Sequence, residues 1–113
     1  MRLSVVEGTG RRADAAGYFV GGKTGSAEKI VDGQYDPDTL VSSFVGAFPM
    51  DKPRYVVFAM LDEPQGTPET LGNATGGWTA APVARASVEA AAPILGVEPR
   101  LSGDAAAGAA LAI

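Results

Sequence analysis

The residues best suited to chemistry gather in one short segment, residues 17–26, which reads GYFVGGKTGS. The segment places an ammonium group at Lys23 and hydroxyl groups at Thr24 and Ser26 among several glycines. Glycine within a strand usually means that another group approaches the backbone closely. If the segment is a strand, Thr24 and Ser26 share one face and Lys23 points to the other. Two known motifs compete to explain these residues.

The first interpretation is a phosphate loop, because residues 17–24 satisfy the pattern G-x-x-x-x-G-K-[ST]. A phosphate loop follows a strand and opens a helix whose N-terminus faces the phosphates. Here the preceding residues 11–16 are polar and do not read as a strand. The residues after the motif include Gly25, Gly33 and Pro37, which oppose a long helix. We therefore disfavour a nucleotide-binding function.

The composition excludes several other kinds of site. The chain has no cysteine and no histidine, so a disulfide, a zinc site with Cys and His ligands and a His-based catalytic triad are all excluded. The chain has 9 basic and 13 acidic residues, a net charge of −4, and its Lys and Arg residues do not cluster. We therefore expect no nucleic-acid partner, no metal and no cofactor.

The second interpretation takes residues 23–26 as the Lys-Thr-Gly motif of serine enzymes that recognise penicillin. Around this motif the chain resembles class B penicillin-binding proteins, and most closely their division-type peptidoglycan D,D-transpeptidases. The resemblance runs from Leu3 to about Pro99 as an ordered set of short motifs. These are Val5-Val6-Glu7-Gly8-Thr9-Gly10, Gly17-Tyr18, Gly21-Gly22-Lys23-Thr24-Gly25-Ser26-Ala27-Glu28, Ser43-Phe44-Val45-Gly46, Pro53-Arg54-Tyr55-Val56-Val57, Asp62-Glu63-Pro64, Gly76-Gly77-Trp78 and Ala80-Ala81-Pro82-Val83.

This resemblance implies a role for each residue of the Lys-Thr-Gly motif. The hydroxyls of Thr24 and Ser26 would bind the terminal carboxylate of a D-Ala-D-Ala stem peptide or of a β-lactam. The Ser26 N–H would form half of the oxyanion hole. Lys23 would supply positive charge beside a serine of a second motif, and Gly25 would leave room for the ligand. Lys23 and Ser26 are therefore the expected catalytic residues, and residues 23–26 together form the expected substrate-binding set.

The sequence offers no working counterpart of the family's nucleophile, a serine in S-x-x-K, or of its S-x-N motif. Ser26 and Lys29 do spell S-x-x-K, but Ser26 already belongs to the Lys-Thr-Gly strand, so we interpret this match as a coincidence. The resemblance implies that the missing N-terminal part of the same domain supplies both motifs. We expect the isolated chain to be inactive.

The resemblance also suggests where the parent protein lies. The parent would be anchored in the inner membrane, with this domain in the periplasm. The chain itself has no run of 18 apolar residues, so it is expected to be soluble.

Apolar patterns and turn residues predict the elements that hold the motif. Strands near residues 18–27, 41–49 and 54–62 have short connections, which implies antiparallel pairing in a three-stranded meander. Residues 31–37 are predicted to form a polar turn. A helix near residues 80–95 is predicted to pack on the sheet. The predicted class is α+β, as part of a DD-peptidase/β-lactamase-like transpeptidase fold.

Two finer predictions concern the last helix and the end of the chain. The apolar stripe of the helix is predicted to contain residues spaced three or four apart, namely Ala84, Val88, Ala91 and Leu95. Residues 1–100 are interpreted as the C-terminal part of a transpeptidase domain. Residues 101–113 are rich in alanine and glycine and are predicted to be a disordered tail.

The third predicted strand raises a question about what covers it. Residues 55–61, YVVFAML, are apolar at every position, which predicts burial on both faces. Three strands and one helix cover only one face of a sheet. The other face must be covered by the parent domain or by a partner, and we expect the isolated chain to form a homo-oligomer. The alternative function is a stand-alone interaction module that docks through this sheet edge or face.

Overall fold

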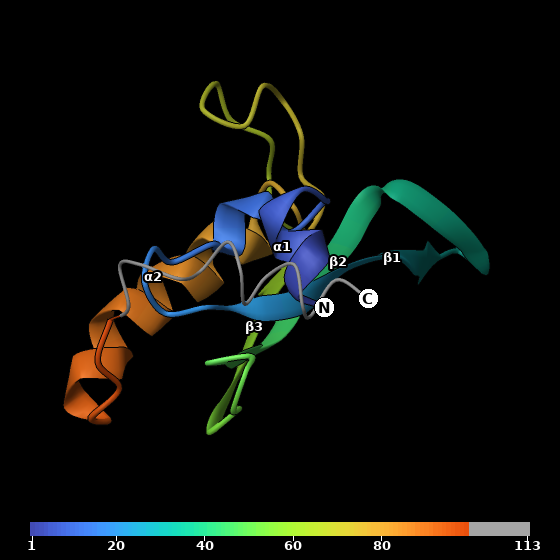
Figure 1. Cartoon of the computed structure of the whole chain (residues 1–113). Helices are drawn as coiled ribbons and strands as arrows, with labels where there is room; N and C mark the ends of the chain where they lie inside the picture. The colour runs from blue at the N-terminus through green and yellow to red at the C-terminus, as the bar shows by residue number, and fades with distance from the viewer. Residues whose placement is uncertain (100–113) are drawn as a thin grey trace.

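A computed structural model describes residues 1–99 as a three-stranded antiparallel sheet with a long helix on one face (Figure 1). The strands lie in the order β1–β2–β3, at Gly21–Val31, Gln34–Phe48 and Tyr55–Asp62, and the helix α2 spans Ala80–Ile94. The predicted α+β meander and its helix are therefore confirmed. The tail predicted at residues 101–113 lies outside the described residues.

Two short elements precede the sheet. Helix α1 spans Arg2–Val6, and a 3-10 turn, η1, spans Arg11–Ala13. The buried Arg2 fixes this region, because its Nη1 donates to Asp14 Oδ1 at 2.9 Å and to the carbonyl oxygen of Val20 at 2.6 Å. Within residues 1–99, no helix is both long and apolar enough to span a bilayer.

Strands β1 and β2 form a hairpin that is longer than predicted and projects from the body of the protein (Figure 1). Its turn consists of Asp32 and Gly33, which have φ values of 52° and 80°. An Asp-Gly pair with positive φ at both positions is a favoured two-residue hairpin turn. The predicted polar turn over residues 31–37 is therefore right in position but too long, because β1 continues to Val31 and β2 begins at Gln34.

The reason for this error is a bulge at Pro37. The register slips here, since Glu28 pairs with Leu40 whereas Lys29 pairs with Asp36. Residues 37–39 therefore bulge out of β2. Proline is tolerated in a bulge because no N–H is needed there for the ladder.

The start of β1 also differs from the prediction. The strand was predicted from residue 18, but it begins at Gly21. Phe19 has a φ of 56°, which is incompatible with an extended strand. Its carbonyl oxygen accepts a hydrogen bond from the N–H of Met50 at 2.9 Å, and its side chain is buried. The aromatic and β-branched residues before Gly21 therefore form core contacts rather than a sheet ladder.

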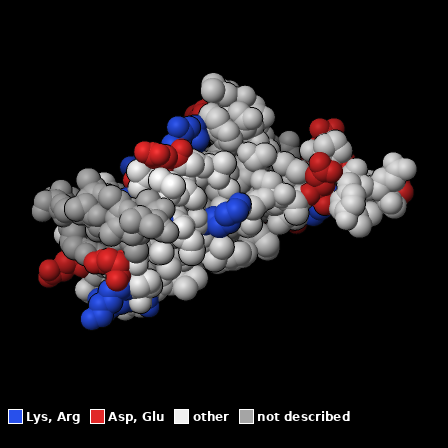
Figure 2. All heavy atoms as spheres, turned by 45° about the vertical axis from the view of Figure 1, so that its right-hand side comes forward, with Lys and Arg blue, Asp and Glu red and all other residues white. Residues whose placement is uncertain are grey.

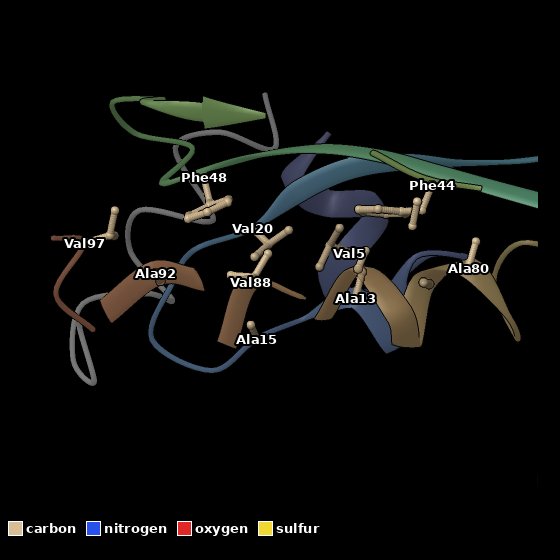
Figure 3. Close-up of a cluster of buried hydrophobic side chains, with 13 residues drawn as sticks. Val5, Ala13, Ala15, Val20, Phe44, Phe48, Ala80, Val88, Ala92 and Val97 are labelled. Atoms are coloured by element: carbon tan, nitrogen blue, oxygen red, sulfur yellow. The ribbon is translucent and has the colours of Figure 1, made fainter. Parts of the chain in front are cut away.

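The core lies between the sheet and α2 (Figure 3). Phe44 and Phe48 of β2 are buried against small side chains of the helix. Full burial of a phenylalanine such as Phe44 contributes about 2–3 kcal/mol. The buried stripe of α2 contains Ala81, Ala84, Val88 and Ala92.

The predicted stripe of α2 is right in its first half and wrong in its second. Ala92 is fully buried, whereas Leu95 is 37% exposed. The stripe continues from Val88 by a step of four rather than three.

The face of the sheet opposite α2 is exposed along β3. The buried or half-buried side chains of this strand alternate with Val56, Phe58 and Met60, which are 74%, 62% and 58% exposed. The prediction that β3 is buried on both faces is therefore wrong for residues 1–99. The reason is that the described part of the chain supplies a helix for one face only.

Candidate active site

The Lys-Thr-Gly motif lies in the middle of β1, which is an edge strand paired with β2 on one side. The polar backbone groups of Gly22 point away from β2, because its N–H donates to the carbonyl oxygen of Met1 at 3.1 Å and its carbonyl accepts from Ser4 Oγ at 2.8 Å. Alternate residues of a strand direct these groups to the same side. The N–H groups of Thr24 and Ser26 therefore also point to the open edge.

The side chains of the motif divide between the two faces of the sheet. Thr24 pairs with the buried Phe44, so Thr24 and Ser26 lie on the face that α2 covers. Lys23 pairs with Val45 and is exposed on the opposite face. Its Nζ donates to the carbonyl oxygen of Thr24 at 2.7 Å. The ammonium group therefore lies near the open edge but on the other side from the hydroxyls.

Thr24 and Ser26 line a pocket of about 300 Å³. Three segments that are distant in sequence build it: the turn after α1 together with η1, the motif strand, and the loop before α2. Its lining residues are Gly8, Thr9, Arg11, Arg12, Thr24, Ser26, Thr75, Gly77 and Trp78. The Thr24 hydroxyl is held by the hydroxyl of Thr9 at 2.9 Å.

The Ser26 hydroxyl is held by the backbone of the loop before α2. The N–H of Gly76 donates to Ser26 Oγ at 2.8 Å. Since Ser26 Oγ acts as the acceptor in this bond, its own O–H is available to donate to a ligand. Gly76 also lies close to the sheet, because a Cβ there would be 2.6 Å from the carbonyl oxygens of Gly25 and Ser43. Only glycine fits this position without a shift of the backbone.

The charge of the pocket comes from two residues that sequence reasoning missed. Arg11 and Arg12 line the pocket together with Trp78, and among residues 1–99 no acidic residue does. The Arg12 guanidinium lies 3.5 Å from the centre of the Trp78 ring, the distance of a stacked cation–π contact. A signal was present in the sequence, because Arg11 directly follows the motif at residues 5–10 and Trp78 ends another matching motif.

Lys29 does not form a catalytic pair with Ser26. This agrees with the interpretation of their S-x-x-K match as a coincidence. Its Nζ binds Asp62 Oδ1 at 2.6 Å and Glu63 Oε1 at 3.0 Å. The hydrogen bond that Lys29 donates to Asp62, followed by the one that it donates to Glu63, raises the pKa of Lys29 above its ordinary value. A lysine that activates a nucleophile needs the opposite shift.

The phosphate-loop interpretation also fails on geometry. After Thr24 the chain continues as a strand to Val31, where a phosphate loop requires a helix. In residues 1–99, no three carboxylates lie close enough to hold a metal ion. On the face that Figure 2 shows, the basic side chains are scattered and form no continuous patch.

Comparisons with known proteins agree with this geometry. Residues 1–89 match the family model described as penicillin binding protein transpeptidase domain. The chain is 46% identical over 107 residues to the probable peptidoglycan D,D-transpeptidase FtsI of Caulobacter vibrioides, a match that covers 87% of this chain and 18% of that protein. It is 45% identical over 96 residues to the stage V sporulation protein D of Bacillus subtilis, covering 85% and 14% of the two proteins. The chain thus spans less than a fifth of the length of these curated relatives.

Solved structures give the same result. The apo transpeptidase domain of Burkholderia pseudomallei penicillin-binding protein 3 matches with a TM-score of 0.72 and 40% identity, covering 87% of this chain and 28% of that one. Penicillin-binding protein 3 of Mycobacterium tuberculosis, complexed with ampicillin, matches with a TM-score of 0.71 and 29% identity, covering 89% and 22%. The resemblance noted from the sequence is therefore confirmed at the level of structure.

Proposed function

Because the chain belongs to the penicillin-binding protein transpeptidase domain family, we propose that it forms one wall of a peptidoglycan D,D-transpeptidase active site. The observation that carries this proposal is the position of the Lys-Thr-Gly motif on an open sheet edge. There the hydroxyls of Thr24 and Ser26 enter the pocket, and the Ser26 N–H points outward beside it.

Thr24 and Ser26 bind the terminal carboxylate of a D-Ala-D-Ala stem peptide or of a β-lactam. Hydrogen bonds to an ionised acceptor are shorter and stronger than neutral ones. Both hydroxyls are already oriented by the rest of the chain, Thr24 by Thr9 and Ser26 by Gly76. Little rotamer freedom is therefore lost when the carboxylate binds.

The N–H of Ser26 donates to the carbonyl oxygen under attack and stabilises the negative charge that develops on it. The second donor is the N–H of the nucleophilic serine, which lies in another part of the domain. Lys23 lies on the exposed sheet face, where it supplies positive charge to a serine of the S-x-N motif. The same face presents Val56, Phe58 and Met60, which the remaining part of the domain covers.

The reaction of the whole protein is transpeptidation through a serine ester. The serine oxygen bonds to the carbonyl carbon of the penultimate D-alanine, the C–N bond to the terminal D-alanine breaks, and the serine proton passes to the leaving amine. An amine of a second stem peptide then displaces the serine, which regains a proton. The proposal includes anchoring of the whole protein in the inner membrane, with this domain in the periplasm.

A second candidate function is that of a stand-alone docking module. The exposed apolar row along β3 favours it, because large apolar patches on a soluble surface mark contact sites. In that case the chain would bind a partner without any chemistry at Ser26.

Labelling with a fluorescent penicillin tests the proposal. We expect the complete domain, with its S-x-x-K and S-x-N segments, to be labelled covalently. The 113-residue chain alone should not be labelled, because no nucleophile with an activating lysine is present. A complete domain that resists labelling would contradict the proposed function. Labelling of the chain alone, mapped to Ser26 by mass spectrometry, would contradict the assignment of Ser26 to the oxyanion strand.

A further inference from the structure

The pocket at the Lys-Thr-Gly strand has a source of positive charge other than the motif lysine. Lys23 does not line the pocket; its side chain lies on the opposite face of β1 and its Nζ binds the carbonyl oxygen of Thr24. Arg11 and Arg12 do line it, and no acidic side chain from the described part of the chain, residues 1–99, lines it with them. An anion in the pocket therefore meets guanidinium groups rather than the motif ammonium.

Of these two arginines, Arg12 is the better placed. It is half-buried, whereas Arg11 is exposed. The next residue, Ala13, is fully buried in the core and fixes the backbone of η1. Arg12 stacks on Trp78 with its guanidinium 3.5 Å from the ring centre. Within residues 1–99, no carboxylate forms a salt bridge with Arg12.

Stacking leaves the hydrogen-bonding edge of a guanidinium available. The contact with Trp78 uses the flat face of the group, while all five N–H donors lie in its plane and point outward. Two of these donors match the spacing of a carboxylate. A partly desolvated position also strengthens the attraction between the two charges.

We infer that Arg12 binds the substrate carboxylate together with Thr24 and Ser26, and that Trp78 holds its guanidinium in place for this contact. The inference rests on the proposed function for the identity of the ligand, a peptide that ends in a free D-alanine carboxylate. It assigns Lys23 and Arg12 to different tasks, since they lie on opposite faces of one strand.

The test uses Trp78, which is the only tryptophan of the chain and lines the pocket. The 113-residue chain at low micromolar concentration is titrated with N-acetyl-D-alanyl-D-alanine, and with its C-terminal amide, while tryptophan fluorescence is recorded. We expect a saturable change with the carboxylate ligand only. Arg12→Gln should weaken this binding at least tenfold. Arg12→Lys should weaken it less, because the charge stays while the planar fork is lost.

The matched control is Arg54→Gln. It removes the same charge and a similar aromatic contact, since the Arg54 guanidinium lies 5.3 Å from the Tyr55 ring, and Arg54 does not line the pocket. This variant should bind like the wild type. No response of the wild type, an equal response to the amide, or equal losses in Arg12→Gln and Arg54→Gln would overturn the inference. Penicillin labelling of the complete domain is a separate readout, so failure of the proposed function is distinguished from failure of this inference.

Discussion

The backbone N–H of Gly76 donates to the side-chain oxygen of Ser26 across 2.8 Å, although 50 positions separate the two residues in the sequence. Gly76 rests directly on the sheet, where a Cβ would lie 2.6 Å from the carbonyl oxygens of Gly25 and Ser43. The loop before α2 therefore reaches the motif strand through a residue without a side chain. The orientation of the Ser26 hydroxyl depends on a residue that does not line the pocket.

Gly76→Ala should displace this loop from the motif strand. In the complete domain we expect acylation by penicillin to slow by about tenfold or more, because an oriented donor to the ligand is lost. Overpacking against backbone atoms should also cost about 1–3 kcal/mol of stability. Stopped-flow acylation and thermal unfolding measure the two effects. Asn73→Ala in the same loop is the control, since Asn73 Nδ2 binds only the carbonyl oxygen of Thr70. Unchanged acylation in Gly76→Ala would refute the role of this contact.

Thr24→Val and Lys23→Ala should each slow acylation of the complete domain at least tenfold, as loss of a single transition-state contact does. The matched controls are Thr39→Val and Lys52→Ala, which make the same chemical changes at residues outside the Lys-Thr-Gly strand β1. Both controls should acylate at the wild-type rate. If Thr24→Val did so too, the carboxylate would not bind at this hydroxyl.

The bulge in β2 should make stability depend on acid pH. The hydrogen bond from Thr39 Oγ1, followed by that from the Asp38 N–H, lowers the pKa of Asp36 below its ordinary value of 3.8. A carboxyl with a lowered folded-state pKa stabilises the fold above its unfolded pKa, and this contribution is lost as pH falls through the folded value. NMR titration of Asp36 measures the shift directly. Thr39→Val should move the pKa upward, whereas Thr24→Val should leave it unchanged.

The exposed face and edge of β3 should make the isolated chain self-associate. An unpaired strand edge beside an apolar face is a template for pairing with another chain. We expect a dimer or larger species in sedimentation velocity, and Phe58→Glu should shift it toward the monomer. Leu71→Glu is the control, because Leu71 is 77% exposed but lies in the loop rather than on β3. A strictly monomeric wild type at high concentration would contradict this prediction.

The sequence predicts the parts of the fold that are encoded by local patterns. The apolar strand β3 is predicted within one residue of its observed bounds, Tyr55–Asp62, and the helix Ala80–Ile94 is predicted equally closely. The strand is a continuous apolar run, and the helix carries apolar residues at spacings of three and four. Errors arise where a tertiary contact overrides propensity. Phe19 is buried and adopts a positive φ, and Pro37 lies in a bulge within a strand.

For the candidate site too, the sequence predicts the residues that form a local motif and misses those that a tertiary contact brings together. Residues 23–26 are predicted because they form one contiguous motif and share one strand. Arg12 and Trp78 are missed because the 3.5 Å contact between them joins segments that are far apart in sequence. The family motifs at residues 5–10 and 76–78 mark both segments, but neither motif alone indicates that Arg12 and Trp78 will meet. The outer face of β3 is mispredicted because its cover does not lie within residues 1–99.

The motif strand is held by two contacts that span very different lengths of chain. Ser4 and Gly22 are separated by 18 positions, whereas Gly76 and Ser26 are separated by 50. The residues that carry Gly76, between Asp62 of β3 and Ala80 of α2, contain no helix or strand. A segment without regular structure opens at a lower free-energy cost than the elements that it joins, so the loop before α2 should detach from the motif strand while the sheet stays intact. On heating, this molecule is expected to lose the ligand-binding geometry of its pocket at a lower temperature than the one at which its sheet unfolds.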